Sequence, residues 1–153
     1  MNTAKLLRVA LDIGEKMLIS GAEIGRVEDS VKRILMTYDM RRADVFTITS
    51  SIVATVTDSE EHTITQTRRI SKYSTDLDKL HSLNALSRKI CAEKPELSQI
   101  QKELSEIDGR KVYPFAVQCA AFALIAGAFT IFFGGNFIDA AAAAVIGAVL
   151  KVV

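Results

Sequence analysis

The sequence has little of the chemistry that disulfide scaffolds and metal sites require. Its 153 residues include two cysteines, two histidines and no tryptophan. Cys91 falls in a predicted helix and Cys119 in a long apolar run, so we do not expect the two thiols to meet. His62 and His81 are separated from other ligand types. The sequence therefore predicts reduced packing thiols, no metal site and no cofactor.

The motifs of common enzyme classes are also missing. The sequence has no nucleophile elbow, phosphate-binding loop or dinucleotide fingerprint. A hydrolase would need a pocket that brings His62 or His81 to a hydroxyl, and no spacing requires such a pocket. The net charge of +1 gives no support to nucleic-acid binding. We therefore expect a protein that is not an enzyme and has no nucleic-acid partner.

Charged residues are almost absent from the last quarter of the chain. Beyond residue 111 only Asp139 and Lys151 are charged, and residues 112–133 carry no charge at all. A helix needs about 20 apolar residues to cross a bilayer. The pattern predicts a polar domain over residues 1–111 and a transmembrane region over residues 112–153. The alternative is a soluble protein with an unusually apolar carboxyl end.

The transmembrane region is expected to hold a first span over residues 112–133 and a second span from about residue 137. The second span is apparently incomplete, because few residues separate Asp139 from Lys151. Charged residues interrupt the amino-terminal helix pattern, so it does not fit a secretory signal. Arg110 and Lys111 precede the first span, which favours a cytoplasmic amino-terminal domain in a multi-pass membrane protein. Small residues suit close helix packing there, among them Ala116, Ala120, Ala123, Gly127, Ala141, Ala144 and Gly147.

In the polar domain, some segments have apolar residues at helical spacing and others have the two-residue alternation of strands. Apolar residues recur at helical spacing over residues 3–19, 22–38, 76–92 and 95–107. β-Branched residues alternate over residues 44–57 and 62–70, with a break at 49–51 that indicates a bulge or a turn. The expected fold class is an α+β cytoplasmic domain, ααβββαα with antiparallel strands, followed by transmembrane α-helices. Capping boxes are expected at Ser20–Glu23 and Thr75–Asp78.

Three groups of polar residues are candidates for function. Glu23 and Arg26 lie on the second predicted helix and are candidates for a substrate gate or a docking surface; the alternative is an ordinary solvated helix surface. Thr49 and Ser50 interrupt the strand pattern and are candidates for ligand contact; the alternative is that they form a turn. The basic pairs 41–42 and 68–69 favour solubility or contact with anionic lipid.

Polar side chains in the apolar region form a further group of candidates. A polar group inside a bilayer lacks water, so such residues often line a pathway. The candidates are Gln118, Thr130, Asn136 and Asp139. For Asn136 and Asp139, helix capping at the outer interface is an equal alternative.

The chain resembles the amino-terminal part of the threonine/serine exporter family (ThrE-like), most of all its YjjP-type subunit. The resemblance covers essentially the whole chain and is carried by LLRVALDIGEKMLISGAEIGRVEDSVKRI, DVFTITSSIVATV, HTITQTRRISKYSTDLDKLHSLNALSRKI and the apolar helix that ends in FGG. Its most specific element is GAE-x-x-R-x-E, and the TSS and TRR elements support it.

The resemblance implies a transporter subunit that exports small amino acids such as threonine and serine, or dicarboxylates such as succinate. It implies membrane lipid and a second small membrane subunit (YjjB-like) or a homo-oligomer as partners. The residues expected to gate or line the substrate pathway are Gly21, Glu23, Arg26, Glu28, Thr49, Ser50, Arg69, Gln118, Thr130, Asn136 and Asp139. The alternative is a membrane-anchored cytoplasmic interaction or regulatory domain without transport of its own. The chain stops inside the expected second span, which is typical of the front part of a longer membrane protein.

Overall fold

The computed structural model describes residues 2–110 and 113–152. The chain forms two compact units, Met1–Arg110 and Lys111–Val153. The boundary expected after residue 111, and the expected start of the first span at residue 112, lie outside the described residues.

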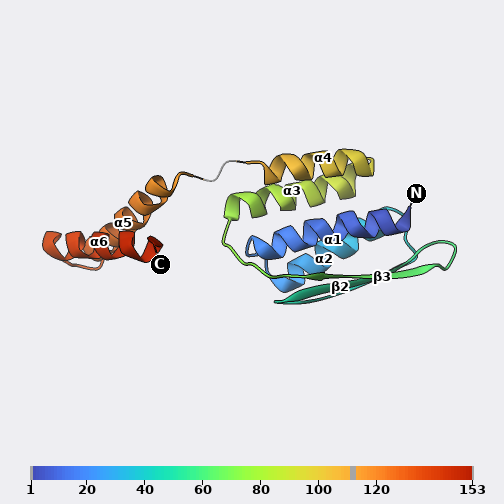
Figure 1. Cartoon of the computed structure of the whole chain (residues 1–153), viewed down its shortest axis with the longest axis horizontal. Helices are drawn as coiled ribbons and strands as arrows, with labels where there is room; N and C mark the ends of the chain where they lie inside the picture. Colours follow the sequence, from blue (N-terminus) through green and yellow to red (C-terminus); the bar gives the residue numbers. More distant parts are fainter. Residues whose placement is uncertain (1, 111–112, 153) are drawn as a thin grey trace. The chain divides into compact units, whose positions relative to one another are not determined.

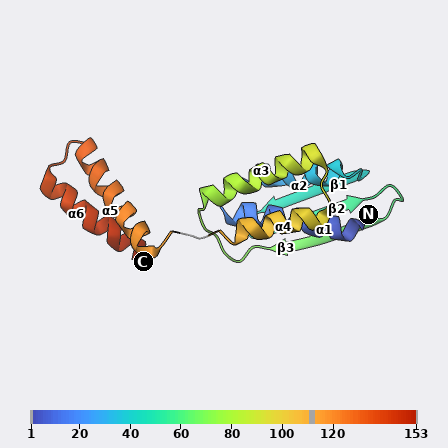
Figure 2. The same ribbon diagram turned by 90° about the horizontal axis from the view of Figure 1, so that it is seen from above.

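The first unit is a three-layered α+β structure (Figures 1 and 2). Its elements are α1 (Thr3–Ile19), α2 (Ile24–Thr37), β1 (Arg42–Ile48), β2 (Ser51–Thr57), β3 (Thr63–Arg69), α3 (Leu77–Glu93) and α4 (Leu97–Asp108). The strands form an antiparallel sheet in the order β1-β2-β3. Helices α1 and α2 cover one face of this sheet, and α3 and α4 form a further layer beyond them.

Helix α1 lies at the centre of the core because it contacts the sheet and the other three helices of the unit. Its fully buried side chains are Leu6, Leu7, Val9, Ala10, Leu11, Ile13 and Met17. Gly14 lets α2 approach closely. A Cβ atom at this position would lie 2.6 Å from Val31 Cγ2, which is too short for a carbon contact. The close packing of α1 against α2 therefore depends on a missing side chain in α1.

Two ion-pair clusters join the layers of the first unit. Arg68 of β3 pairs with Asp12 of α1 at 3.0 Å and with Glu15 at 3.6 Å. Asp108, at the end of α4, accepts Lys16 of α1 at 2.5 Å and Lys79 of α3 at 2.6 Å. Both clusters are partly exposed, so each contributes modestly to stability.

Replacing Asp108 by asparagine is expected to lower stability in a pH-dependent manner. Burial alone raises the pKa of Asp108, but hydrogen bonds from Lys16 and Lys79 outweigh it and hold the pKa below its usual value. The contribution, up to about 1 kcal/mol, is therefore present above the ordinary aspartate pKa and is lost as the pH falls through the lowered one.

Thermal unfolding of the full chain in detergent, followed by circular dichroism at several pH values, measures this effect. The wild type should exceed Asp108→Asn in melting temperature near neutral pH, and the two curves should converge in acid. A difference that stays constant down to acidic pH would contradict the assignment.

Most of the helices and strands predicted for the first unit are present in the structure, but the predicted capping boxes were wrong. Helix α1 has the predicted bounds, and the expected break is a turn at residues 49–50, after which β2 begins at Ser51. Ser20 instead ends α1, and Glu23 precedes α2 without a side-chain capping bond. Helix α3 is capped by Asp76, whose carboxylate accepts the Lys79 N–H at 2.9 Å. Ser20 does not cap α2 because that helix begins only at Ile24, so its N-cap position falls on Glu23.

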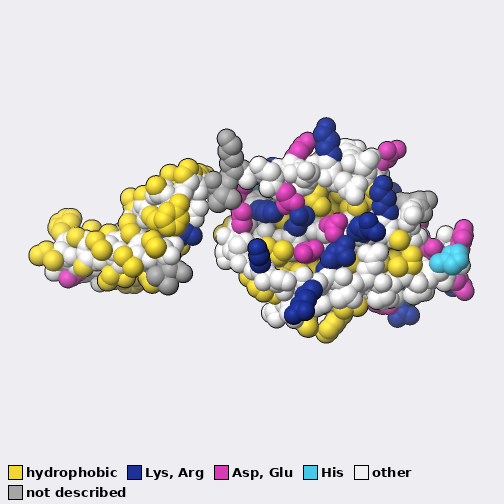
Figure 3. All heavy atoms as spheres, viewed as in Figure 1, with side chains coloured by type: hydrophobic (Ala, Val, Ile, Leu, Met, Phe, Trp, Pro, Cys, Tyr) yellow, Lys and Arg dark blue, Asp and Glu magenta, His cyan; other side chains and the backbone are white. Residues whose placement is uncertain are grey.

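The second unit is a helical hairpin of α5 (Phe115–Phe132) and α6 (Phe137–Val152). Gly134 lies in the turn with φ +89°, a conformation that favours glycine. Over this hairpin the surface visible in Figure 3 carries mostly hydrophobic side chains and few charged ones, whereas the first unit shows many charged side chains. No residue of α5 is buried. Such a surface suits contact with lipid rather than water.

The predicted fold class was wrong in expecting several transmembrane helices. The described residues form six helices and a three-stranded sheet, and α5 alone among these helices is long and apolar enough to cross a membrane. Its 18 residues extend about 27 Å at 1.5 Å per residue. Helix α6 has 16 residues, with Asp139 in its first turn and Lys151 in its last. The charges at both ends leave too short an apolar stretch between them.

Small residues bring α5 and α6 together. A Cβ atom at Gly127 would lie 3.2 Å from the Ala140 carbonyl oxygen, and one at Gly147 would lie 2.7 Å from the Phe122 carbonyl oxygen. Ala144 also contacts the Gly127 position. The expected role in packing is confirmed for Gly127, Ala144 and Gly147. Ala123 is half-buried, whereas Ala116, Ala120 and Ala141 are exposed.

Candidate functional site

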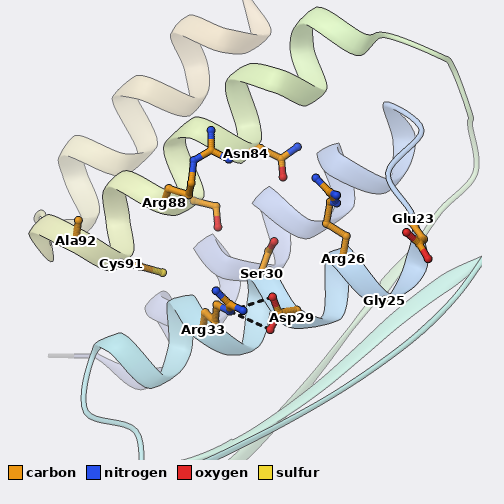
Figure 4. Close-up of a pocket in the computed structure, with 11 residues that line it drawn as sticks. Glu23, Gly25, Arg26, Asp29, Ser30, Arg33, Asn84, Arg88, Cys91 and Ala92 are labelled. Carbon is orange, nitrogen blue, oxygen red and sulfur yellow. Dashed lines mark hydrogen bonds and ion pairs between the residues drawn. The ribbon is translucent and has the colours of Figure 1, made fainter.

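The candidate site is a groove between α2 and α3 with a volume of about 740 Å³ (Figure 4). We call it the arginine groove. Its lining residues are Glu23, Gly25, Arg26, Asp29, Ser30 and Arg33 from the α2 side, and Asn84, Ser87, Arg88, Cys91 and Ala92 from α3. The volume falls within the usual range for small-molecule sites.

The helical repeat places these side chains together. In α2, Val27, Val31 and Ile34 face the core, so that Arg26, Asp29 and Arg33, three or four residues apart, share the neighbouring surface. In α3 the same spacing relates Asn84, Arg88 and Cys91. Figure 4 shows the Arg26 side chain extending from α2 toward α3, where Asn84 lies. The two helices thus form the two walls of the groove.

Positive charge predominates in the groove, and part of it is unpaired. Arg33 donates from Nε to Asp29 at 2.9 Å. Arg26 and Arg88 have no ion-pair partner within residues 2–110 and 113–152, and both are exposed. Because a guanidinium presents five donors in a planar fork, two free arginines can bind a carboxylate or another planar anion.

Acceptors also reach the groove. The Glu23 carboxylate is exposed at the start of α2 and makes no capping bond there. Asn84 donates from Nδ2 to the Leu80 carbonyl oxygen at 2.9 Å, which leaves its side-chain oxygen as an acceptor. The described part of the chain contains no group of three metal-ligating side chains. The arrangement can therefore bind an organic ion that carries both signs of charge.

The structure brings together only two of the seven residues proposed in the first unit. Glu23 and Arg26 line the groove. Sequence reasoning missed Arg33, Asn84 and Arg88. The spacing of Asn84, Arg88 and Cys91 indicated a shared helix face, but no local signal showed that this face lies opposite α2.

Two other residues of the GAE-x-x-R-x-E motif have structural contacts outside the groove. Glu28 accepts the backbone N–H of Thr47 at 2.6 Å, which ties α2 to the edge strand β1. Gly21 has φ +94° and lies against the segment that leads into α3, since a Cβ atom there would be 3.7 Å from the Ser74 carbonyl oxygen. These contacts position α2 against β1 and the turn before α2 against the segment that leads into α3.

The TSS and TRR elements meet at one end of the sheet. Thr49 and Ser50 form the exposed turn between β1 and β2, and the Ser50 carbonyl oxygen accepts the Ile70 N–H at 2.9 Å. Arg69 is exposed and pairs in register with Ser51, whereas Arg68 points inward to Asp12. None of these residues lines the groove.

The polar side chains of the second unit bond to their own backbone neighbours. Gln118 donates to the Tyr113 carbonyl oxygen at 2.7 Å, and Thr130 donates to that of Ala126 at 2.9 Å. The Asn136 side chain accepts the Asp139 N–H at 2.9 Å, and Asp139 accepts the Asn136 N–H at 3.1 Å. Asn136 and Asp139 thus cap α6 reciprocally. A pathway role for these four residues stays a prediction.

Comparison with known proteins gives one match. The model of a family described as "Putative threonine/serine exporter" matches residues 8–153. No curated protein and no solved structure matches the chain. The family match covers the arginine groove and the apolar hairpin alike.

Proposed function

The chain belongs to the threonine/serine exporter family, and we propose that it is a subunit of an inner-membrane exporter for threonine, serine or similar small metabolites. In this proposal α5 lies in the bilayer and the first unit lies in the cytoplasm. The observation that carries the proposal is the family match together with an 18-residue apolar helix that buries none of its side chains.

The cytoplasmic placement is supported by the charges beside α5. Arg110 is the last described residue before the apolar unit, Lys111 follows it in the sequence, and no basic residue occurs between α5 and α6. Basic residues next to a span favour the cytoplasmic side. Arg110 also donates to Ser82 at 2.6 Å, which joins this basic end to α3.

A complete pathway requires more than this chain in our proposal. A single candidate span among the described residues cannot enclose a substrate pathway by itself. The four polar side chains of the second unit also already form hydrogen bonds to nearby backbone groups. A second small membrane subunit or further copies of the chain would supply the remaining walls. Dicarboxylates such as succinate are the second substrate class to test.

An efflux measurement tests the proposal. Cells that express the chain, alone or together with a second small membrane subunit (YjjB-like), are loaded with labelled threonine, serine or succinate, and loss of label is followed. Faster efflux of at least one substrate than from cells without the chain is expected. Equal efflux would contradict export and favour the membrane-anchored regulatory alternative.

A further inference from the structure

We propose that the arginine groove binds a free small amino acid in its zwitterionic form, with Arg26 and Arg88 holding the carboxylate and Glu23 and Asn84 holding the ammonium group. The choice of ligand rests on the proposed export function. The place of binding rests on the geometry of the first unit.

The carboxylate half of the site consists of the two unpaired arginines. Arg33 contributes less than the other two arginines because its Nε already pairs with Asp29 at 2.9 Å. Arg26 and Arg88 come from different helices and line the same groove. A carboxylate between them would replace water with charge-assisted hydrogen bonds, which are about twice as strong as neutral ones.

The ammonium half consists of two acceptors without competing partners in the described residues. The Glu23 carboxylate makes neither an ion pair nor a capping bond. The side-chain oxygen of Asn84 is open because its nitrogen bonds to Leu80. An ammonium group has three donors and no acceptor, so these two oxygens match it.

The charge balance favours a zwitterion over a simple anion. Once Asp29 neutralises Arg33, the groove keeps two positive side chains and one negative one. A dicarboxylate would satisfy the arginines, but its second carboxylate would be repelled by the like charge of Glu23 in the same groove. Because the site contacts the groups that all α-amino acids share, serine, threonine and alanine should bind with similar affinity.

Calorimetric titration of the purified full chain in detergent tests the site directly. Threonine is compared with threoninol, which lacks the carboxylate, and with 3-hydroxybutyrate, which lacks the ammonium group. Each analogue should bind at least tenfold more weakly than threonine. Arg26→Gln and Arg88→Gln should each weaken threonine at least tenfold, whereas Lys32→Gln, an exposed cation of α2 outside the groove, should leave binding unchanged.

The Glu23→Gln variant separates the two halves of the site. It should weaken threonine at least fivefold and leave 3-hydroxybutyrate unchanged or slightly stronger. Absence of threonine binding to the wild type, equal binding of threonine and 3-hydroxybutyrate, or unchanged binding in both arginine variants would each overturn the inference.

Binding and export can fail independently. Efflux without binding in the groove would overturn this inference and leave the proposed function intact. Binding without efflux would support the site and contradict the exporter proposal. The calorimetric measurement requires no transport, so each outcome is assigned to one of the two proposals.

Discussion

Replacing Leu124 by arginine is expected to move most of the chain out of the membrane fraction. Leu124 lies near the middle of α5 and is 73% exposed. Arginine at the centre of a membrane helix costs about 3 kcal/mol more than leucine on insertion scales, which corresponds to roughly a hundredfold change in partition. Fractionation of cells by ultracentrifugation, with immunodetection of the chain, measures the effect.

The matched control is Leu124→Ile, which keeps an apolar side chain of the same size at the same position. It should remain in the membrane fraction. If the arginine variant also remained there in wild-type amounts, α5 would not be the element that holds the chain in the membrane.

Replacing Gly14 by leucine is expected to destabilise the first unit by about 3 kcal/mol, because overpacking a close-packed core forces side chains off their rotamers and shifts backbone. The new Cβ atom would lie 2.6 Å from Val31 Cγ2 and 3.4 Å from Val27 Cγ1. Valine cannot turn away easily, since its χ1 is restricted in a helix. Thermal unfolding of the full chain in detergent, followed by circular dichroism, measures the loss.

Gly25→Leu provides the comparison within the same fold. Gly25 also lies in a helix, but a Cβ atom there would have no atom within 4 Å. Leucine is the better helix former, so this variant should be slightly more stable than the wild type, by about 0.5–1 kcal/mol. Equal melting temperatures for the two leucine variants would show that α1 and α2 are not packed as described.

Periodicity predicted the elements of the first unit because each of them buries one regular face. The alternating burial of Ile52, Ala54 and Val56 is visible in the sequence of β2, and α1 begins and ends at the predicted residues. Caps were less predictable, since several hydroxyl and carboxyl residues compete at each helix end. Asp76 caps α3 one residue beyond the predicted Thr75.

The candidate site was only half predictable. Glu23 and Arg26 lie within one motif, so a local pattern indicated them. Arg88 lies far along the chain and reaches the groove only because α2 and α3 pack side by side. Conversely, Glu28 belongs to the same motif as Glu23 and Arg26 but does not line the groove, because its carboxylate accepts a hydrogen bond from the Thr47 backbone N–H. A shared motif therefore did not mean a shared role.

For the second unit, the length of the apolar sequence led to a wrong prediction of the number of membrane spans. The sequence indicated two spans because residues 112–150 are nearly all apolar. The turn that contains Gly134 and the charges at both ends of α6 leave α5 as the one helix of sufficient length among the residues that the structure describes. Counting the residues between helix ends is therefore more informative than counting apolar residues.

The proposed export function requires that α5 lies in lipid while the first unit stays in water. Flotation of the purified full chain with liposomes on a density gradient, after detergent removal, tests this directly. We expect the chain to float with the liposomes and to resist extraction by alkaline carbonate. A chain that stays at the bottom of the gradient as a soluble monomer, without detergent, would contradict the account.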